Sequence, residues 1–305
     1  MVPEIVIQLV LYNDAPFLPG LLSSLRKQTF NNFHLIAVDN SSDDSAAKKF
    51  RDLWPEGELY RSDCNLGYAG GHTRLMETTL KRGAPFALVL NTDVLLQKDF
   101  LRNLHDQLVR FPGVDACGPL ILQGVNNRKT KIVQNYRLYM NFPLGKKSSP
   151  DEGRILRSYK ELPVSADVDY LSGVAFMIRT SVFENMSFFD PGLFLYGEER
   201  DFFYRFSKSG CVAMVTRKAV CRHLHDWAAQ SKEGYRREYY YLRRNKILYF
   251  KKYNFRKGLI RFLFFEFIKL PVTLVWSIRK GGIKMFGWYW LGIWHGLTGK
   301  KGRYI

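Results

Sequence analysis

Short apolar runs alternate with segments of helical periodicity along the chain as far as Pro112. The mostly apolar stretches predict buried strands, because such runs are typical of strands covered on both faces of a sheet; they are Glu4–Val10, His34–Val38 and Phe86–Leu90. Apolar residues recur at helical spacing between and after them, which predicts helices over Leu18–Gln28, Gly71–Arg82 and Lys98–Phe111. This alternation indicates βαβ crossovers, so the predicted fold class is α/β with a mostly parallel sheet.

The pattern changes beyond this first part of the chain. Residues 123–165 are polar, with paired lysines and serines, which favours a mobile excursion that could act as a lid. A second compact block is predicted from Asp167 to about Ser231. After it, Leu259–Leu297 is aromatic, apolar and sparsely charged.

Polar residues follow two of the predicted strands at the point where each strand ends. Asp39 ends the second strand, and Asn91-Thr92-Asp93 follows the last. Ligands of doubly wound sheets bind at the carboxyl ends of the strands, where a carboxylate can hold a divalent cation. Asp93 could equally cap the following turn. Asp39 lies too early to cap the helix after Ser45, which leaves its carboxylate for another role.

Two further segments could take part in binding or catalysis. Asn65–His72 has three glycines before a helix, which lets the backbone approach an anion closely but also fits a plain loop. Tyr196–Asp201 concentrates three acids at the start of a predicted helix. The helix dipole alone would favour acids there, and a carboxylate beside a cleft could also serve as a general base.

His223 and His225 lie two residues apart in a predicted strand, so both imidazoles are expected on one face. Neutral imidazole is a common metal ligand, although a pair of histidines can also be purely structural. The four cysteines include no CxxC pair and are expected to be buried, unbridged residues.

Charge is distributed unevenly along the chain. The formal net charge is +18, and the segment Lys232–Ile305 holds 18 Lys+Arg against 3 Asp+Glu, a net of +15. Such asymmetry points to an anionic partner for the tail, either nucleic acid or a membrane surface. The apolar run Leu259–Ile278 carries charges and a proline that a membrane span would rarely tolerate. Its aromatics and flanking cations fit helices lying in a membrane interface, or helices packed on the domain.

Several motifs occur in a specific order. They are Val38–Ser42, Asn65–His72, Leu90–Asp93, Leu171–Gly173 with Met177–Arg179, Phe189–Pro191 leading into Tyr196–Asp201, and His225–Trp227 with Ser231. In this order they resemble the family 2 glycosyltransferases, and within them the rhamnosyltransferase-like members that build bacterial surface polysaccharides. The resemblance covers roughly residues 5–250.

The resemblance implies an A-type glycosyltransferase fold with a Rossmann-like sheet. The catalytic domain would span residues 1–250, with a donor half over about 1–122 and an acceptor half over about 165–231. Residues 251–305 would form basic, aromatic, membrane-associating helices.

The resemblance also implies roles for individual residues. Glu199 would be the catalytic base, with Glu198 beside it. The donor would be bound by Tyr12, Asp39, Asn65, Gly67, Gly70, Gly71, His72, Asn91 and Thr92. The acceptor would be bound by Ser172, Gly173 and Asp201. A divalent cation, Mn²⁺ or Mg²⁺, would be held by Asp93 with His225 or His223.

Three positions depart from the family pattern. Asn91 stands where the first Asp of the metal motif is usual, and an amide is the weaker ligand. Glu199 stands where Asp is usual, and one extra methylene moves the carboxylate by more than about 1 Å. The family histidine fits His223 by its spacing from Gly210 and His225 by its spacing to Ser231, with His225 slightly favoured.

The expected activity is an inverting, metal-dependent transfer of a sugar, with rhamnose favoured, from a dTDP- or UDP-sugar to a saccharide hydroxyl. The expected acceptor is lipid-linked, and the expected location is cytoplasmic, on the inner leaflet of the membrane. No nucleic-acid partner is expected. Two other interpretations remain: a nucleic-acid-binding protein using stretches such as Tyr239–Arg244, and a nucleotidyltransferase, which also places a metal-binding Asp at a strand end.

Overall fold

The computed structural model describes residues 2–124, 131–225 and 231–305. Its central sheet contains a parallel group of strands, in which β1 (Ile5–Leu11) lies between β2 (Phe33–Asp39) and β4 (Phe86–Leu90), and β3 (Glu58–Arg61) pairs with β2. These strands agree with the predicted ones to within one or two residues at each end. The crossovers run through α1 (Leu18–Arg26), α2 (Ser45–Leu53) and α3 (Gly67–Lys81).

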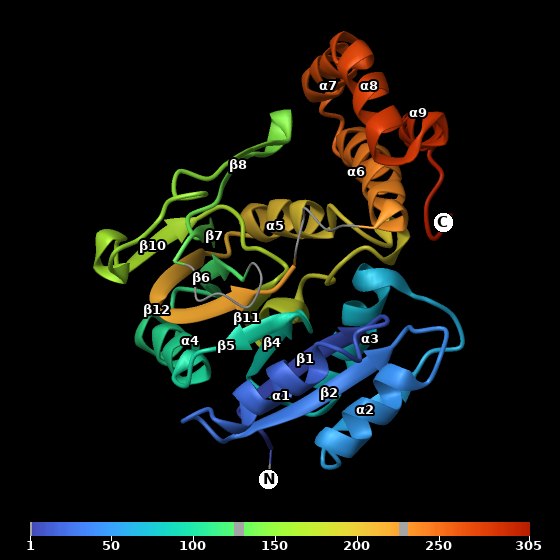
Figure 1. Ribbon diagram of the computed structural model, residues 1–305. Helices are drawn as coiled ribbons and strands as arrows, with labels where there is room; N and C mark the ends of the chain where they lie inside the picture. The colour runs from blue at the N-terminus through green and yellow to red at the C-terminus, as the bar shows by residue number, and fades with distance from the viewer. Residues whose placement is uncertain (1, 125–130, 226–230) are drawn as a thin grey trace.

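The sheet continues from β4 into a mixed half, in the order β10-β12-β6-β11-β4-β1-β2-β3 (Figure 1). β11 (Ala175–Arg179) runs antiparallel between β4 and β6 (Ala116–Gln123), and β12 (Ala213–His223) is parallel to β6. β5 (Val94–Leu96) and β10 (Ser165–Val168) pair with β12, and β7 (Val133–Asn135) pairs with β6. The α/β prediction with a mostly parallel sheet is therefore confirmed.

The described part of the polar stretch 123–165 is not the mobile excursion that its composition suggested. In its described part, 131–165, β7 and β10 join the sheet, and β8 (Tyr139–Asn141) forms a hairpin with β9 (Lys146–Ser148). The prediction was wrong because apolar residues interspersed among the polar ones supply a core; Val133, Tyr136, Leu138 and Met140 are all buried.

Helices cover both faces of the sheet. The odd-numbered residues of β1 pack toward α1, α2 and α4 (Phe100–Arg110), whereas Val6 packs with Leu75 of α3 on the other face. α5 (Glu198–Lys208) joins the core on the α3 side through its phenylalanines. Single 3₁₀ turns lie in the connections; they are Phe142–Leu144, Tyr159–Glu161, Thr180–Glu184 and Pro191–Leu193. This layering leaves the carboxyl ends of the parallel strands available for a site.

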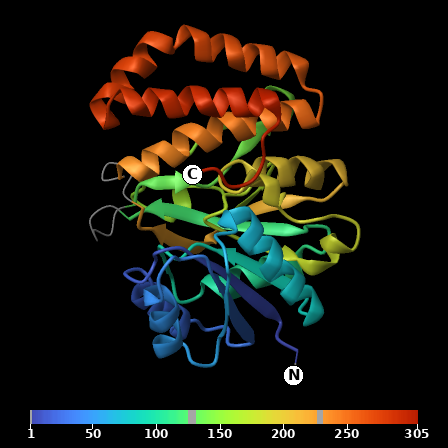
Figure 2. The ribbon, with the colours of Figure 1, turned by 90° about the vertical axis from the view of Figure 1, so that its right-hand side faces the viewer.

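Four helices after the sheet stack at the end of the molecule opposite the N-terminus (Figures 1 and 2). They are α6 (Lys232–Lys252), α7 (Arg256–Ile268), α8 (Leu270–Gly281) and α9 (Ile283–Thr298). α9 packs on α6, where Met285, Tyr289 and Ile293 are buried. The chain end then returns to the body, since the Tyr241 hydroxyl accepts a hydrogen bond from the Tyr304 backbone N–H and Gly302 donates to the Gly192 carbonyl.

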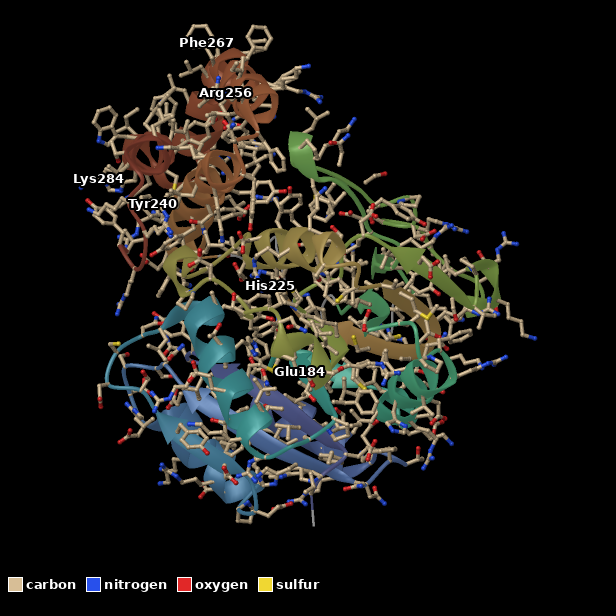
Figure 3. All side chains as sticks on the ribbon, turned by 180° about the vertical axis from the view of Figure 1, so that it is seen from behind. Glu184, His225, Tyr240, Arg256, Phe267 and Lys284 are labelled. Carbon is tan, nitrogen blue, oxygen red and sulfur yellow. The ribbon has the colours of Figure 1, made fainter. Side chains whose placement is uncertain are left out.

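The aromatic residues of these helices divide into two groups. One group packs within the protein, as Tyr289 does. The other is exposed and includes Phe264, Phe265, Phe267, Trp276 and Trp294. Phe267 lies at the outer edge of the molecule (Figure 3). None of the helices within the described ranges combines the length and apolar character that crossing a membrane requires.

Candidate active site

Three carboxylates meet where the parallel strands end. Asp39 is the last residue of β2 and pairs with Leu11, the last residue of β1. Asp93 follows β4 on the other side of β1, and Asp14 follows β1 itself. These positions result from strand order, because neighbouring parallel strands present their carboxyl ends at one edge.

Asp39 is fully buried, and only one of its two carboxylate oxygens is hydrogen-bonded within the described residues. Its Oδ1 accepts a hydrogen bond from the Ser41 backbone N–H at 2.9 Å. Its Oδ2 lies 3.6 Å from Nη1 of Arg61 and has no hydrogen-bond partner among the described residues. A buried acceptor without a donor is costly, so the geometry suits a ligand that donates an N–H or O–H there.

Asp14 was not singled out in the sequence, and the structure places it in this group. Its Oδ2 accepts a hydrogen bond from the Tyr12 backbone N–H at 2.9 Å. Burial raises the pKa of Asp14 to about 6; hydrogen bonds from Tyr12 and Thr92 oppose the rise, and the charges of Asp93 and Asp39 add to it. The signal that could have found Asp14 is its position just after the first strand, at the same edge as the other two acids.

Asp93 lies between the two histidines of the sequence prediction. Its Oδ1 is 3.2 Å from Nε2 of His223, and its Oδ2 is 3.8 Å from Nδ1 of His225. Burial alone would raise the pKa of Asp93, but the hydrogen bond and charges of the histidines outweigh burial and hold this pKa below its usual value. The two imidazole rings stack with centroids 5.7 Å apart, so the sequence alternatives His223 and His225 both reach Asp93.

Gln134 fixes one of these histidines from behind. Its side-chain amide lies 2.9–3.1 Å from Nδ1 of His223, which directs Nε2 toward Asp93. An outer hydrogen bond of this kind sets the tautomer and orientation of an imidazole. Within the described ranges, no group of three or more His, Cys, Asp or Glu is arranged to hold a metal ion. In kind, however, one carboxylate with two imidazoles is a donor set that suits a divalent cation.

A pocket of about 120 Å³ opens beside these acids. It is lined by Val10, Tyr12, Asn40, Asn65, Gly67, Tyr68, Phe194, Leu195 and Arg237. Three of the predicted donor-binding residues, Tyr12, Asn65 and Gly67, therefore come together. The guanidinium of Arg237, from α6, lies 5.4 Å from the centre of the Tyr12 ring and supplies the pocket's cation. Sequence reasoning missed Arg237 because only tertiary structure brings α6 to this edge.

The rest of the glycine segment has a different role from the predicted one. The structure starts α3 at Gly67, so Gly70, Gly71 and His72 belong to a helix. A Cβ on Gly71 would lie 2.8 Å from Val10, so this glycine allows α3 to pack closely on β1. His72 is fully buried against the rings of Tyr68 and Phe189, and burial lowers the pKa of His72 to about 3. These three residues pack inside the fold and do not line the pocket.

Glu198 and Glu199 begin α5, behind Gly197, whose φ of 89° turns the chain into the helix. A Cβ on Gly173 would collide with Oε1 of Glu199, so Gly173 permits the close approach of this carboxylate. Glu199 also accepts hydrogen bonds from the Gly173 backbone and the Tyr170 hydroxyl. Glu198 is buried, and its Oε2 has no hydrogen-bond partner in the described part of the chain.

Burial raises the pKa values of both glutamates above their ordinary range, and their mutual repulsion reinforces the effect at Glu198. A carboxylate with a raised pKa that stands at a cleft is suited to take a proton from a hydroxyl.

Tyr68 connects the glutamates to the pocket. Its ring lines the pocket, and its hydroxyl donates to the Gly173 carbonyl at 2.5 Å. The pKa of Tyr68 is raised well above its usual value by burial and by the charges of Glu199, Glu198 and Asp93. Tyr68 therefore stands within electrostatic reach of both the Glu199 carboxylate and the Asp93 carboxylate.

Some of the remaining predicted residues lie near the site in the structure, and Asp201 does not. Ser172 lies beside Gly173, and its Oγ accepts a weak hydrogen bond from Val174 at 3.4 Å. Asn91 and Thr92 lie at the end of β4, with Thr92 against Asp14. Asp201 is not brought to the site: its buried carboxylate binds Arg205, Lys252 and the Tyr253 hydroxyl. Asp226 and Trp227 lie outside the described residues.

Comparisons with known proteins identify the family. The model of glycosyl transferase family 2 matches residues 7–186. The chain belongs to this family. It is therefore a glycosyltransferase, and the family prediction made from the motifs is confirmed.

Two curated relatives of this glycosyltransferase carry related activities. The N-acetylglucosaminyl-diphospho-decaprenol L-rhamnosyltransferase of Mycobacterium tuberculosis (strain H37Rv) is 27% identical over 226 residues, which are 70% of this chain and 74% of that protein. The low-salt glycan biosynthesis hexosyltransferase Agl10 of Haloferax volcanii is 28% identical over 180 residues, 56% of this chain and 52% of that protein.

Solved structures of similar fold include A-type glycosyltransferases. GalNAc-T7, crystallised with UDP, GalNAc and Mn²⁺, matches with a TM-score of 0.61 at 13% identity, over 82% of this chain and 48% of that one. S. aureus TarS 1-349 in complex with UDP matches with a TM-score of 0.51 at 16% identity, over 80% and 65%. At these identities the likeness establishes the fold of this glycosyltransferase.

The stretch that suggested nucleic-acid binding is part of this fold's interior. Tyr240 and Tyr241 are fully buried, so their rings are not available to stack on bases. Arg244 is also fully buried and donates hydrogen bonds to the carbonyls of Leu193 and Gly302.

Proposed function

We propose that this glycosyltransferase transfers a sugar, with rhamnose favoured, from a nucleoside-diphosphate sugar to a hydroxyl of a saccharide linked through a diphosphate to a polyprenyl lipid. The proposal rests first on Tyr68. Its ring lines the donor pocket, and the charges of both Glu199 and Asp93 raise the pKa of its hydroxyl. An inverting transfer requires a base for the acceptor hydroxyl and positive charge for the departing diphosphate, both within reach of one bound donor. The activity of the mycobacterial relative supports the choice of sugar and acceptor.

In this mechanism Asp39 accepts a hydrogen bond from the nucleobase through its unpartnered Oδ2. Tyr12, Asn65 and Gly67 line the nucleotide's pocket, and Arg237 faces the negative charge of the diphosphate. Asp93 with His223 or His225 would hold a divalent cation, which when bound supplies positive charge to the departing diphosphate.

Glu199 acts on the acceptor. Its carboxylate takes the proton of the acceptor hydroxyl as that oxygen bonds to the anomeric carbon of the sugar. The bond from this carbon to the diphosphate oxygen breaks on the opposite face, so the configuration inverts. Gly173 and the Tyr170 hydroxyl hold Glu199 in place, and burial keeps its pKa high enough for it to act as a base.

The proposal extends to the place where the reaction occurs. A lipid-linked acceptor is reached at a membrane surface, and the exposed aromatics of α7 and α8 together with the basic tail fit a peripheral site on an anionic, cytoplasmic face. Residues 251–305 would then be the membrane-associating part, beside a catalytic domain over 1–250.

The test is release of nucleoside diphosphate from dTDP-, UDP- and GDP-sugars with Mn²⁺ or Mg²⁺. We expect release from one donor, strongly reduced in Glu199→Gln and in Asp93→Ala. Glu184→Gln is the matched control, since Glu184 is an exposed carboxylate that does not line the pocket. Absence of release from every donor with either metal, or full activity of Glu199→Gln, would contradict the proposal.

A further inference from the structure

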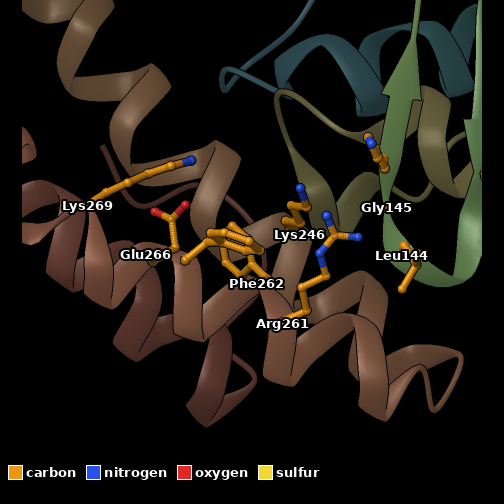
Figure 4. Close-up of a pocket in the computed structure, with 9 residues that line it drawn as sticks. Leu144, Gly145, Lys246, Arg261, Phe262, Glu266 and Lys269 are labelled. Carbon is orange, nitrogen blue, oxygen red and sulfur yellow. The ribbon is translucent and has the colours of Figure 1, made fainter.

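A second pocket lies between the β8–β9 hairpin and helices α6 and α7 (Figure 4). It has a volume of about 190 Å³. Four basic side chains and one acid line it, together with apolar residues; the lining is Leu144, Gly145, Lys146, Lys246, Arg261, Phe262, Phe265, Glu266 and Lys269. In Figure 4, Lys246 and Arg261 lie between Phe262 and the segment that carries Leu144 and Gly145, and Lys269 lies beyond Glu266.

The pocket has an excess of positive charge that its single acid does not neutralise. Glu266 is buried and already engaged, because it accepts a hydrogen bond from the Tyr289 hydroxyl and lies 3.6 Å from Nε of Arg243. Within residues 2–124, 131–225 and 231–305, none of the four basic residues forms an ion pair. A concave site with several unpaired cations is suited to a multiply charged anion.

Lys246 is the most enclosed of the four cations. The pKa of Lys246 is lowered to about 8, chiefly by burial; the charges of Arg200, Lys269 and Arg243 contribute to the lowering, and Glu266 opposes it. Its ammonium also lies 5.0 Å from the centre of the Phe262 ring. An anion that binds beside such a lysine stabilises the charged form of its side chain.

The pocket is connected to the catalytic glutamates through α6. Asn245, next to Lys246, donates hydrogen bonds to the carbonyls of Leu193, Leu195 and Tyr196 at 2.9, 2.9 and 2.7 Å, and so holds the segment that leads into Glu198. Arg200, next to Glu199, lies within electrostatic reach of Lys246. The pocket is thus separate from the donor pocket, and α6 joins it to the segment that carries the glutamates.

An exposed apolar surface adjoins the pocket. Phe265 lines the pocket and is 42% exposed, while its neighbours Phe264 and Phe267 on α7 are 59% and 68% exposed. The surface continues onto α8 with Val272, Val275 and Trp276. An anion site that opens beside exposed apolar residues fits an amphiphile, with a charged group on the cations and an apolar chain along the helices.

We propose that the pocket of Lys146, Lys246, Arg261 and Lys269 binds the diphosphate of the lipid-linked acceptor, while the apolar chain lies along α7 and α8. This assignment rests on the proposed function for the identity of the acceptor. It gives the enzyme two diphosphate sites, one for the donor at the sheet edge and one for the acceptor at the helices. The acceptor sugar is then presented to Glu199 by a group bound outside the catalytic pocket.

The experiment measures binding of three probes to the full chain without any donor: farnesyl diphosphate, inorganic pyrophosphate and farnesol. The test variant is Arg261→Gln with Lys269→Gln, two exposed residues whose replacement leaves the core intact. The control variant is Lys257→Gln with Lys284→Gln, which removes two exposed cations outside the pocket, one from α7 and one from α9. Equal thermal unfolding midpoints establish that both variants are folded.

We expect the test variant to bind farnesyl diphosphate roughly 10-fold or more weakly, because two phosphate-facing cations are lost. The control variant should bind it as the wild type does, and farnesol binding should be equal in all three proteins. Equal loss in test and control variants would overturn the proposal, since it would mean attraction by the overall charge alone. Equal affinity of the wild type for farnesyl diphosphate and pyrophosphate would overturn the lipid assignment.

The readout separates this proposal from the function it rests on. Probe binding requires neither a donor sugar nor catalysis, so failure of nucleoside diphosphate release would contradict the proposed function without changing this result. Conversely, an active transferase whose test variant binds farnesyl diphosphate normally would contradict the pocket assignment alone.

Discussion

The carboxyl edge of the sheet and the C-terminal helices place their charged residues in different environments. At the sheet edge the charges are carboxylates that lie largely inside the protein: Asp39 is 0% and Glu198 is 3% exposed. On the helices the charges around the second pocket are mostly cations at the surface, beside aromatic residues that are also exposed. The neighbours of a buried carboxylate set its pKa and its orientation, which suits it to a catalytic role. Exposed cations beside apolar surface suit a phosphate and a lipid.

The substitution with the largest expected effect tests the buried carboxylates. Glu199→Gln keeps the size of the side chain but removes its ability to accept a proton, so sugar transfer should fall by about 10²–10⁴-fold. Donor binding should remain, because the nucleotide pocket is unchanged. The measurement is kcat for transfer together with donor affinity by calorimetry. A variant that loses donor binding and kcat equally would mean that Glu199 has a structural role.

The next effect concerns the position of that carboxylate. Gly173→Ala places a Cβ where Oε1 of Glu199 lies, and the displaced carboxylate should lower kcat by roughly 10²-fold. Gly113→Ala is the matched control, because a Cβ there meets nothing within 4 Å. Transfer by Gly173→Ala at the rate of the control would show that the close approach of Gly173 to Glu199 is unimportant.

The helical region is tested through its exposed aromatics. Phe264→Ser with Phe267→Ser removes two apolar side chains that are 59% and 68% exposed, so binding to anionic vesicles should weaken by roughly 10-fold. The matched control is Val109→Ser with Phe111→Ser at the end of α4, on another part of the surface. Vesicle co-sedimentation gives the comparison. Equal vesicle binding by both variants would mean that the exposed aromatics of α7 contribute no more to membrane binding than apolar residues elsewhere on the surface.

A smaller effect concerns the pH dependence of the rate. Glu199 must be ionised to accept a proton, and burial raises its pKa, so the acid limb of kcat/KM should lie above pH 4.5. Glu198→Gln removes the adjacent carboxylate, so the limb should move to lower pH. A limb that stays in place would show that the two carboxylates do not interact in the working enzyme.

The smallest expected effect is on stability. The pKa of Glu198 is higher in the folded chain than its ordinary value, so folding is favoured at low pH and this contribution is lost as pH rises through the folded-state pKa. Glu198→Gln should therefore raise the unfolding midpoint at neutral pH and flatten its dependence on pH. Thermal unfolding followed between pH 5 and pH 8 checks this, with Glu184→Gln as the exposed control.

Much of the site could be predicted because strand ends and motifs are local in the sequence. Asp39 and Asp93 were identified from the strands they follow, and both lie at the predicted edge. The packing of Gly70, Gly71 and His72 inside the fold could not be predicted, because glycines near a helix start serve close packing as readily as ligand binding. The contacts of Asp201 could not be predicted either, because its partners Lys252 and Tyr253 come about 50 residues later, which spacing alone cannot reveal.

The sequence by itself determined the α/β class, the acids at the strand ends and the basic, aromatic character of the tail, because each depends on residue type and local period. Only the tertiary structure decided which of these residues meet. It brought Arg237 of α6 to the donor pocket, enclosed Tyr240 and Tyr241, and placed Lys246 and Arg261 around a common pocket. Contacts between distant segments follow from how helices pack on the sheet, and packing depends on the shape of the whole chain rather than on any one stretch of it.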